Sequence, residues 1–165
     1  MAISYLDLVS EILNNFRLVK NPSDIVKFFG EGCITEISDE PLVQVMDKML
    51  EILSPLPIGF EQKTFQFIDI NNNQCVFDVT FYENKLVNFR CQKYFKGWFA
   101  LGKAIKFNSF KLRPLVNKII GIDSVHHDFA NDKFYCDNFK GLVVVFGQIN
   151  ENKSVSTWIT DKQYF

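Results

Sequence analysis

The sequence lacks any apolar run of the ~20 residues that a helix needs to cross a bilayer. Its first residues also lack the basic stretch that opens a secretory signal, and the acidic Asp7 follows almost at once. We therefore expect a protein that is neither secreted by an ordinary signal nor inserted in a membrane. A cytoplasmic location is the prediction.

Cysteine is present, but no C-x-x-C pair occurs. Cys33, Cys75, Cys91 and Cys136 are widely spaced, and each has apolar neighbours in the sequence. This spacing does not match the paired ligands of zinc sites or the dithiols of redox enzymes. Reduced, buried thiols, as in cytosolic proteins, are expected.

Patterns that carry catalysis are also missing. The sequence contains no nucleophile elbow, no P-loop and no glycine-rich dinucleotide turn after a strand. His126 and His127 are adjacent, so their side chains point in different directions on a regular element, and the H-x-x-x-H spacing of helical metal sites is absent. We predict no catalytic residues, no metal site, no cofactor and no enzymatic activity; a hydrolase that uses one of these histidines as a base is a third alternative.

The composition is that of an ordered protein. Of the 165 residues, 47% are hydrophobic, 22% are charged and eighteen are Phe. A chain of this length folds as one domain and buries roughly 70% of the surface that its unfolded form exposes. The sequence shows no internal repeat or linker. A single domain over residues 1–165 is predicted.

Apolar residues at helical spacing predict three helices in the N-terminal third. The first covers about 4–19 and opens with Ser4 and Asp7 as a capping box; the second begins at Pro22 and ends near Gly30. The third runs from about 38 to 53, where prolines end it. A loop over 31–37 joins the second helix to the third.

From residue 60 the apolar spacing changes to two, which predicts strands. Three strands near 60–68, 75–82 and 87–91 are joined by turns too short for a parallel return, so they form an antiparallel meander. A hairpin follows over 134–146, and its second strand, apolar on both faces, is expected to be central. A last strand covers 155–159.

The prediction is therefore an α+β domain in which N-terminal helices pack on an antiparallel sheet of about five strands. The strand order stays open. The segment 94–109 fits a short helix and a bent strand equally well. A further helix from Phe110 to Ile120 would hold Pro114 in its first turn and end at Gly121.

One segment is strongly basic. Residues 84–122 hold nine Lys/Arg and no Asp or Glu, which leaves nine basic and nineteen acidic residues elsewhere in a chain of net charge −1. The molecule is expected to be a charge dipole. The candidate partner-binding residues are Lys93, Lys96, Trp98, Lys103, Lys106, Lys111 and Arg113.

Two interpretations of this segment compete. Its charges alternate with aromatic residues, as in sites for single-stranded nucleic acid, although the rings are equally typical of a core under a solvated basic face. No RNP, KH or helix-turn-helix signature is present, and the pI near 6.1 is low for a nucleic-acid-binding domain. The acidic remainder of the chain is a second candidate surface, suited to a basic partner protein.

In size and composition the whole chain resembles bacterial immunity proteins of toxin systems, including those of contact-dependent growth inhibition. These are small, single-domain cytosolic proteins rich in Phe, Asn, Ile and Lys. The resemblance implies a non-catalytic protein that binds a cognate toxin domain and blocks its active site or its access to substrate. It assigns no residue a role. A single-stranded nucleic-acid-binding module that uses residues 84–122 is the alternative.

Overall fold

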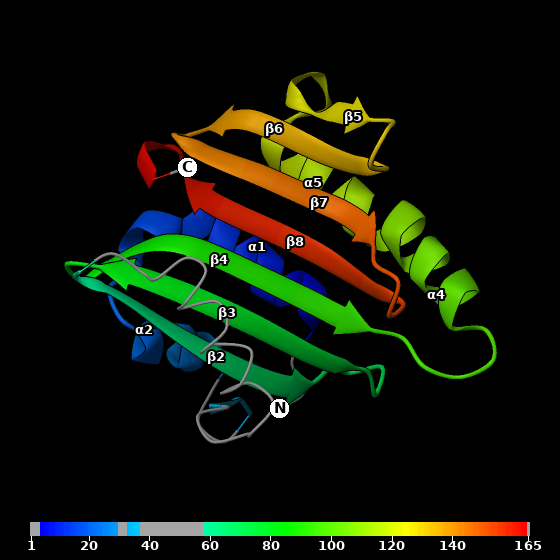
Figure 1. The fold of residues 1–165 in the computed structure, drawn as a ribbon, viewed down its shortest axis with the longest axis horizontal. Coiled ribbons are helices and arrows are strands. Elements are labelled where there is room, and N and C mark those ends of the chain that lie inside the picture. The colour runs from blue at the N-terminus through cyan, green and yellow to red at the C-terminus, as the bar shows by residue number, and fades with distance from the viewer. Residues whose placement is uncertain (1–3, 30–32, 37–57, 165) are drawn as a thin grey trace.

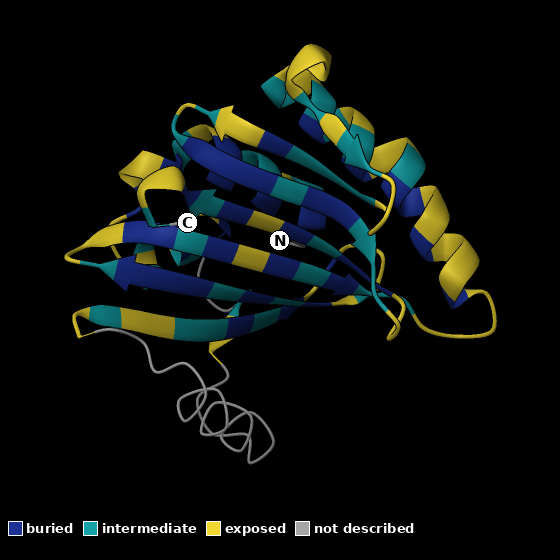
Figure 2. Cartoon of the chain, turned by 45° about the horizontal axis from the view of Figure 1, so that its top comes forward, coloured by how far each residue is buried: buried dark blue, intermediate teal, exposed yellow. Residues whose placement is uncertain are grey.

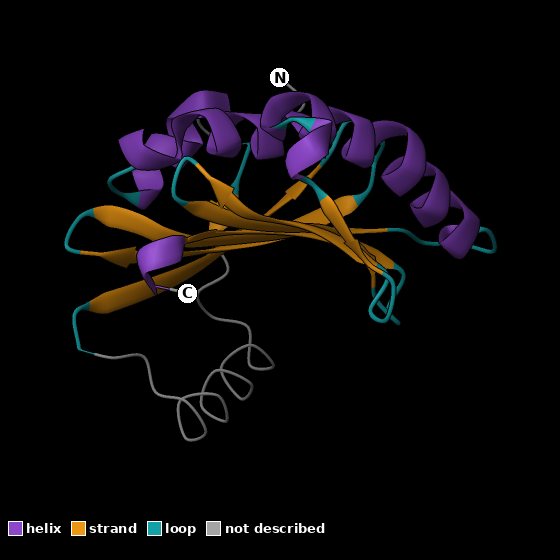
Figure 3. Cartoon of the chain, turned by 90° about the horizontal axis from the view of Figure 1, so that it is seen from above, coloured by secondary structure: helices purple, strands orange, loops and turns teal. Residues whose placement is uncertain are grey.

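A computed structural model describes residues 4–29, 33–36 and 58–164, and these form one layer of helices on one sheet (Figures 1 and 3). The described sheet has eight strands, all in antiparallel pairs, in the order β1-β2-β3-β4-β8-β7-β6-β5. The strands are β1 (Thr35–Glu36), β2 (Phe60–Ile68), β3 (Gln74–Tyr82), β4 (Lys85–Tyr94), β5 (His126–Asp128), β6 (Lys133–Phe139), β7 (Leu142–Ile149) and β8 (Ser154–Asp161).

The described α-helices lie on one face of the sheet (Figure 3). They are α1 (Tyr5–Asn15), α2 (Pro22–Phe29), α4 (Ala100–Phe107) and α5 (Arg113–Ile120). A π-helical turn, η2 (Asn108–Leu112), joins α4 to α5, and short 3-10 turns follow other elements: η1 (Phe16–Leu18), η3 (Ile122–Ser124) and η4 (Lys162–Tyr164). No helix within these described ranges is both long enough and apolar enough to cross a bilayer.

The α+β class, the meander β2-β3-β4 and the hairpin β6-β7 are confirmed, but the predicted number of about five strands is wrong. Two of the additional strands, β1 and β5, have two and three residues, too few to show a spacing of two. β1 lies within the predicted loop 31–37. The predicted helix at 38–53 and the prolines after it lie outside the described residues.

The expected central position of β7 is also wrong, because β4 and β8 form the middle pair. Val143 and Val145 point to the face of β7 that the described helices do not cover, where they line a hollow with Trp158. Apolar residues on both faces of β7 therefore reflect a fully buried face, with Val144 and Phe146, and a second face on which Val143 is still buried, rather than a place at the centre of the sheet.

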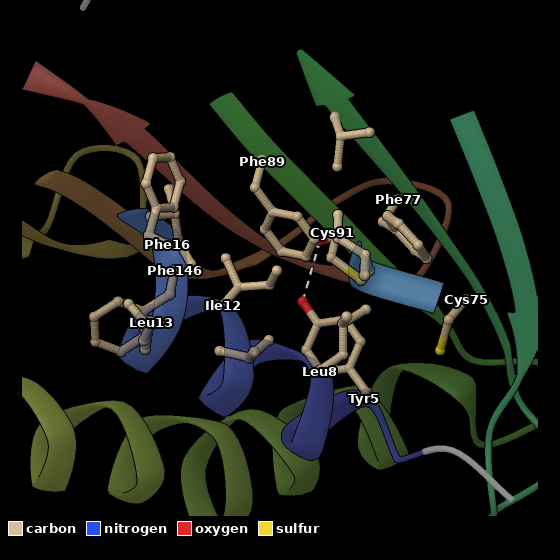
Figure 4. Close-up of a cluster of buried hydrophobic side chains, with 14 of the residues drawn as sticks. Tyr5, Leu8, Ile12, Leu13, Phe16, Cys75, Phe77, Phe89, Cys91 and Phe146 are labelled. Atoms are coloured by element: carbon tan, nitrogen blue, oxygen red, sulfur yellow. Dashed lines mark hydrogen bonds between the residues drawn. The ribbon is translucent and has the colours of Figure 1, made fainter. Parts of the chain in front are cut away.

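Helix α1 holds the two halves of the sheet together from the covered face. The Ser4 side chain accepts hydrogen bonds from the backbone N–H groups of Leu6 and Asp7, which caps the helix start as predicted. The buried Tyr5 hydroxyl lies 3.1 Å from the carbonyl oxygen of Cys91 on β4 (Figure 4). It also lies 2.8 Å from Thr157 Oγ1 on β8. Burial raises the pKa of Tyr5 well above its usual range, so the hydroxyl keeps its proton.

The segment 94–109 contains a helix rather than a bent strand. Gly97, at φ 94°, turns the chain out of β4, and α4 begins three residues later. Pro114 lies in the first turn of α5 and Gly121 ends it, as the sequence predicts. At the π-helical turn the Asn108 side chain donates a 2.8 Å hydrogen bond to the carbonyl oxygen of Gly147 on β7, which fixes the helices to the sheet.

Candidate functional site

A cavity of about 590 Å³ opens between the turn that joins β2 to β3, the end of β4 and helix α4. Five lysines line it, and the lining residues within the described chain include no Asp or Glu. We call it the lysine cavity; its lining residues are Asn71, Asn72, Asn73, Lys93, Phe95, Lys96, Lys103, Lys106, Phe107, Phe110 and Lys111.

One stripe of the helical segment supplies the far wall of the cavity. Five lining residues recur at the spacing i, i+3, i+4, i+7 and i+8, which places them along one side of a helix: Lys103, Lys106, Phe107, Phe110 and Lys111. Ala100, Ala104 and Phe107 face the core and seat α4 on the sheet. The lysines beside them remain exposed and point their charge into the cavity mouth.

Lys93 forms the floor and is only 2% exposed. It lies on the same side of β4 as the buried Phe89 and Cys91, and its ammonium forms an ion pair with the buried Asp69. The Lys93 Nζ also lies 4.4 Å from the centre of the Phe107 ring, within cation–π range. A buried charge needs such partners, because the transfer of an unpaired ion from water into the protein interior costs several kcal/mol.

The Asp69 carboxylate also stabilises the turn beside the cavity. Asp69 Oδ1 accepts hydrogen bonds from the backbone N–H groups of Asn71 at 2.9 Å and Asn73 at 3.0 Å. The Asn73 side chain donates a 3.0 Å bond to the carbonyl oxygen of Tyr94. One carboxylate therefore fixes both the floor lysine and the asparagine turn that forms the near wall.

The thiol nearest this ion pair is unreactive. Cys75 is paired with Lys93 across β3 and β4. Burial, with the negative charge of Asp69 acting in the same direction, raises the pKa of the Cys75 thiol well above its usual range. Cys75 is therefore a neutral core thiol rather than a nucleophile for the cavity.

The structure brings five of the seven candidate partner-binding residues together, because Lys93, Lys96, Lys103, Lys106 and Lys111 all line the cavity. The other two lie elsewhere. Trp98 is fully exposed just before α4, and the Arg113 guanidinium lies 4.1 Å from the centre of the Phe134 ring, toward β6.

Asp69 and the asparagine turn 71–73 are site residues that sequence analysis missed. The sequence marks 71–73 as a turn, but nothing in it connects that turn with residues more than twenty positions later. The helical spacing of Lys103, Lys106 and Lys111 could have indicated that they share one side of a helix. This signal was not used, because residues 94–109 fit a helix and a bent strand equally well.

A second feature lies on the opposite flank of α4. Leu101 and Ile105, one helical turn apart, are each 47% exposed, and Phe99 before them is 77% exposed. Together with Trp98 they make up what we call the α4 apolar patch. Figure 2 shows α4 projecting past the end of the sheet with exposed residues along it.

The histidine pair contributes to local structure. His127 stacks on Phe134 with ring centres 4.4 Å apart, and its Nε2 lies 3.0 Å from Asp132 Oδ1. The Asp128 side chain accepts hydrogen bonds from Ala130 and Asn131, and those from Asn131 hold its pKa below the usual range. Across the part of the chain that the structure describes, no three His, Cys, Asp or Glu side chains gather as metal ligands do.

Comparison with protein-family models, with curated proteins and with solved structures found no match. Function must therefore be inferred from the chemistry of the lysine cavity and the α4 apolar patch.

Proposed function

We propose that this protein binds a partner protein through the α4 apolar patch and neutralises it, without catalysing a reaction. The observation that carries this proposal is the exposure of four large apolar side chains at one end of one helix. Large apolar side chains that are exposed together within one short segment, here residues 98–105, are typical of interaction sites.

The patch has the composition of an interface centre. Trp98 is fully exposed, and tryptophan is among the residues that most often dominate binding energy once a partner excludes water from them. The patch belongs to the basic segment, since residues 84–122 hold nine Lys/Arg and no acid. The complementary partner would present an apolar pocket rimmed by Asp and Glu, because opposite charges at the rim speed association and set specificity.

The neutralising role extends the resemblance to immunity proteins. A toxin domain covered by the projecting end of α4 would lose access to its substrate, and no chemistry by this protein is needed for that outcome. Binding in the cytoplasm is part of the proposal, since a toxin delivered to the cell acts there.

The test is protection of a bacterial host against the domain encoded immediately upstream of this gene. Co-expression of this protein should restore growth, and the purified pair should form a complex at about 150 mM salt, where rim charges are screened. The triple variant W98S/L101S/I105S should bind at least about 100-fold more weakly, because truncation at the centre of an interface costs ~2 kcal/mol or more per residue.

The matched control is L18S/I122S, which removes two side chains that are each 70% exposed and lie away from α4. This control should protect as well as the unaltered protein. Equal loss in the control, or full protection by the triple variant with an unchanged unfolding midpoint, would contradict the patch as the interface.

A further inference from the structure

We infer that the lysine cavity is a second binding site, and that its ligand is the phosphate of a nucleotide. This inference goes beyond the proposed function, because it uses different residues and a different kind of ligand. It rests on the charge of the cavity, on the way its floor is built and on the ring at its mouth.

The charge favours an anion of several charges. Lys96, Lys103, Lys106 and Lys111 are exposed around the opening, and the floor lysine is already balanced by Asp69. Five lysines with one carboxylate leave a local net charge of +4. Lysine ammonium groups act as point charges suited to phosphate oxygens.

The floor is buried and held by several contacts, which favours a specific ligand over a diffuse ion cloud. The Lys93 ammonium is held by Asp69 and covered by the Phe95 and Phe107 rings, whose centres lie 5.6 Å apart. Phe107 in turn packs edge-on against the buried Tyr5. The exposed lysines therefore surround a packed, partly apolar base.

The mouth carries a ring for a base to stack on. Phe110 lines the cavity and is 73% exposed, although a phenylalanine at this position in a core helix would normally be buried. Asn71 and Asn72 are exposed on the facing wall and offer amide donors and acceptors. The volume of about 590 Å³ lies within the range of ~300–1,000 Å³ typical of small-molecule sites.

Helical geometry separates this cavity from the α4 apolar patch. Lys103 and Lys106 lie on one flank of α4, and Leu101 and Ile105 lie on the other. The two sites therefore use different side chains, and the substitutions that test one site leave the side chains of the other in place.

The experiment is calorimetric titration of the purified full chain at about 150 mM salt with three probes: ATP, pyrophosphate and a single-stranded thymidine oligonucleotide of about 20 residues. ATP should bind, and K103E/K106E should weaken that binding at least about 100-fold by removing two charge-assisted contacts. The control K20E/K162E makes the same charge change at two exposed lysines outside the cavity lining and should bind ATP normally.

The ring is tested separately. F110A should weaken ATP about 5- to 100-fold through lost stacking and leave pyrophosphate unchanged, whereas F129A, which removes an 84% exposed ring elsewhere, should change neither. An oligonucleotide that binds more tightly than ATP with the same dependence on Lys103, Lys106 and Phe110 would identify a polynucleotide as the source of the phosphates.

Three results would overturn the inference. The first is no binding of any probe at about 1 mM. The second is an ATP affinity that K20E/K162E lowers as much as K103E/K106E does, and the third is an F110A variant whose affinities for ATP and pyrophosphate change by the same factor or not at all. The patch variant W98S/L101S/I105S should bind ATP normally. Failure of the nucleotide site is thereby distinguished from failure of the partner interface.

Discussion

Lys93 occupies a position that the strand pattern assigns to the core. It follows Phe89 and Cys91 at a spacing of two, and both of these are fully buried. A lysine there is tolerated because Asp69, two strands away in the sheet, reaches the same point on the covered face. Both charges lose their hydration on burial. The ion pair between Lys93 and Asp69, and the hydrogen bonds that Asp69 accepts from the turn, compensate for this loss.

Breaking this pair should be costly. We expect K93M to lower the free energy of unfolding by about 3 to 5 kcal/mol, because the Asp69 carboxylate stays buried without its counter-charge. The double variant D69N/K93M should recover most of the loss, since an amide oxygen still accepts from the turn. Chemical denaturation of the purified variants measures both.

Lys63 provides the control for this prediction. It lies 3.7 Å from Glu36 and 3.9 Å from Glu61, and its side chain is 34% exposed. K63M should cost under ~1 kcal/mol, as partly exposed ion pairs do. Equal losses in K63M and K93M would show that burial of the Lys93 pair has no special energetic weight.

At this scale the sequence could predict that residue 93 faces the core, but not how a charge survives there. The spacing of two from Phe89 places Lys93 inward, and we nevertheless expected it in a partner-binding surface. Its partner lies twenty-four residues earlier, and no local pattern joins a floor lysine to an aspartate in a turn.

The elements themselves were predictable where their patterns were long. Ser4, Pro22 and Gly121 mark helix ends that the structure confirms, whereas α5 begins at Arg113, after the π-helical turn, and not at the predicted Phe110. Helix α4 was not predictable in the same way, because Gly97 and Gly102 interrupt a short stretch that fits a helix and a bent strand equally well.

The junction between helices and sheet depends on Gly147. Its φ is 79°, and a Cβ there would lie 2.7 Å from Asn108 Oδ1 and 3.2 Å from the Phe134 ring. We expect G147A to lower the free energy of unfolding by ~2 kcal/mol or more, from backbone strain and from the displaced Asn108. Thermal and chemical unfolding report this change.

Gly102 is the matched control within α4. A Cβ at Gly102 would meet no heavy atom within 4 Å, and its backbone is helical. G102A should therefore stabilise the protein by about 0.5 to 1 kcal/mol, because alanine is the better helix former. A neutral G147A beside a stabilised G102A would show that β7 accepts a side chain at Gly147, where its pairing with β8 shifts register, and that the junction is not constrained.

The whole molecule combines a net charge of −1 with a basic segment of nine Lys/Arg and no acid. In the structure this segment runs through β4, α4 and α5, and four of its exposed lysines surround one cavity. Such a cluster of positive charge creates a local positive potential that attracts anions, although the net charge of the protein is slightly negative.

We therefore expect the protein to be retained on a cation exchanger at pH 7 in low salt, although its net charge is negative. K103E/K106E should elute at clearly lower salt than K20E/K162E, which carries the same net charge. Because retention depends on the local field within a Debye length of ~10 Å, equal elution of the two variants would show that the lysines act as a dispersed charge.

The antiparallel middle pair of the sheet has a kinetic consequence. β4 and β8 join residues as far apart as Asn88 and Thr160, and Tyr5 bonds to both strands. During translation the meander and α1 emerge long before residue 161, so the hydroxyl of Tyr5 has only half of its docking site, and the edge of β4 that pairs with β8 has no partner. Closing so long a loop is slow, and the unpaired edge of β4 is open to non-native pairing until it closes. The nascent chain is therefore at its most vulnerable to aggregation and to chaperone capture in the interval between the synthesis of β4 and that of β8.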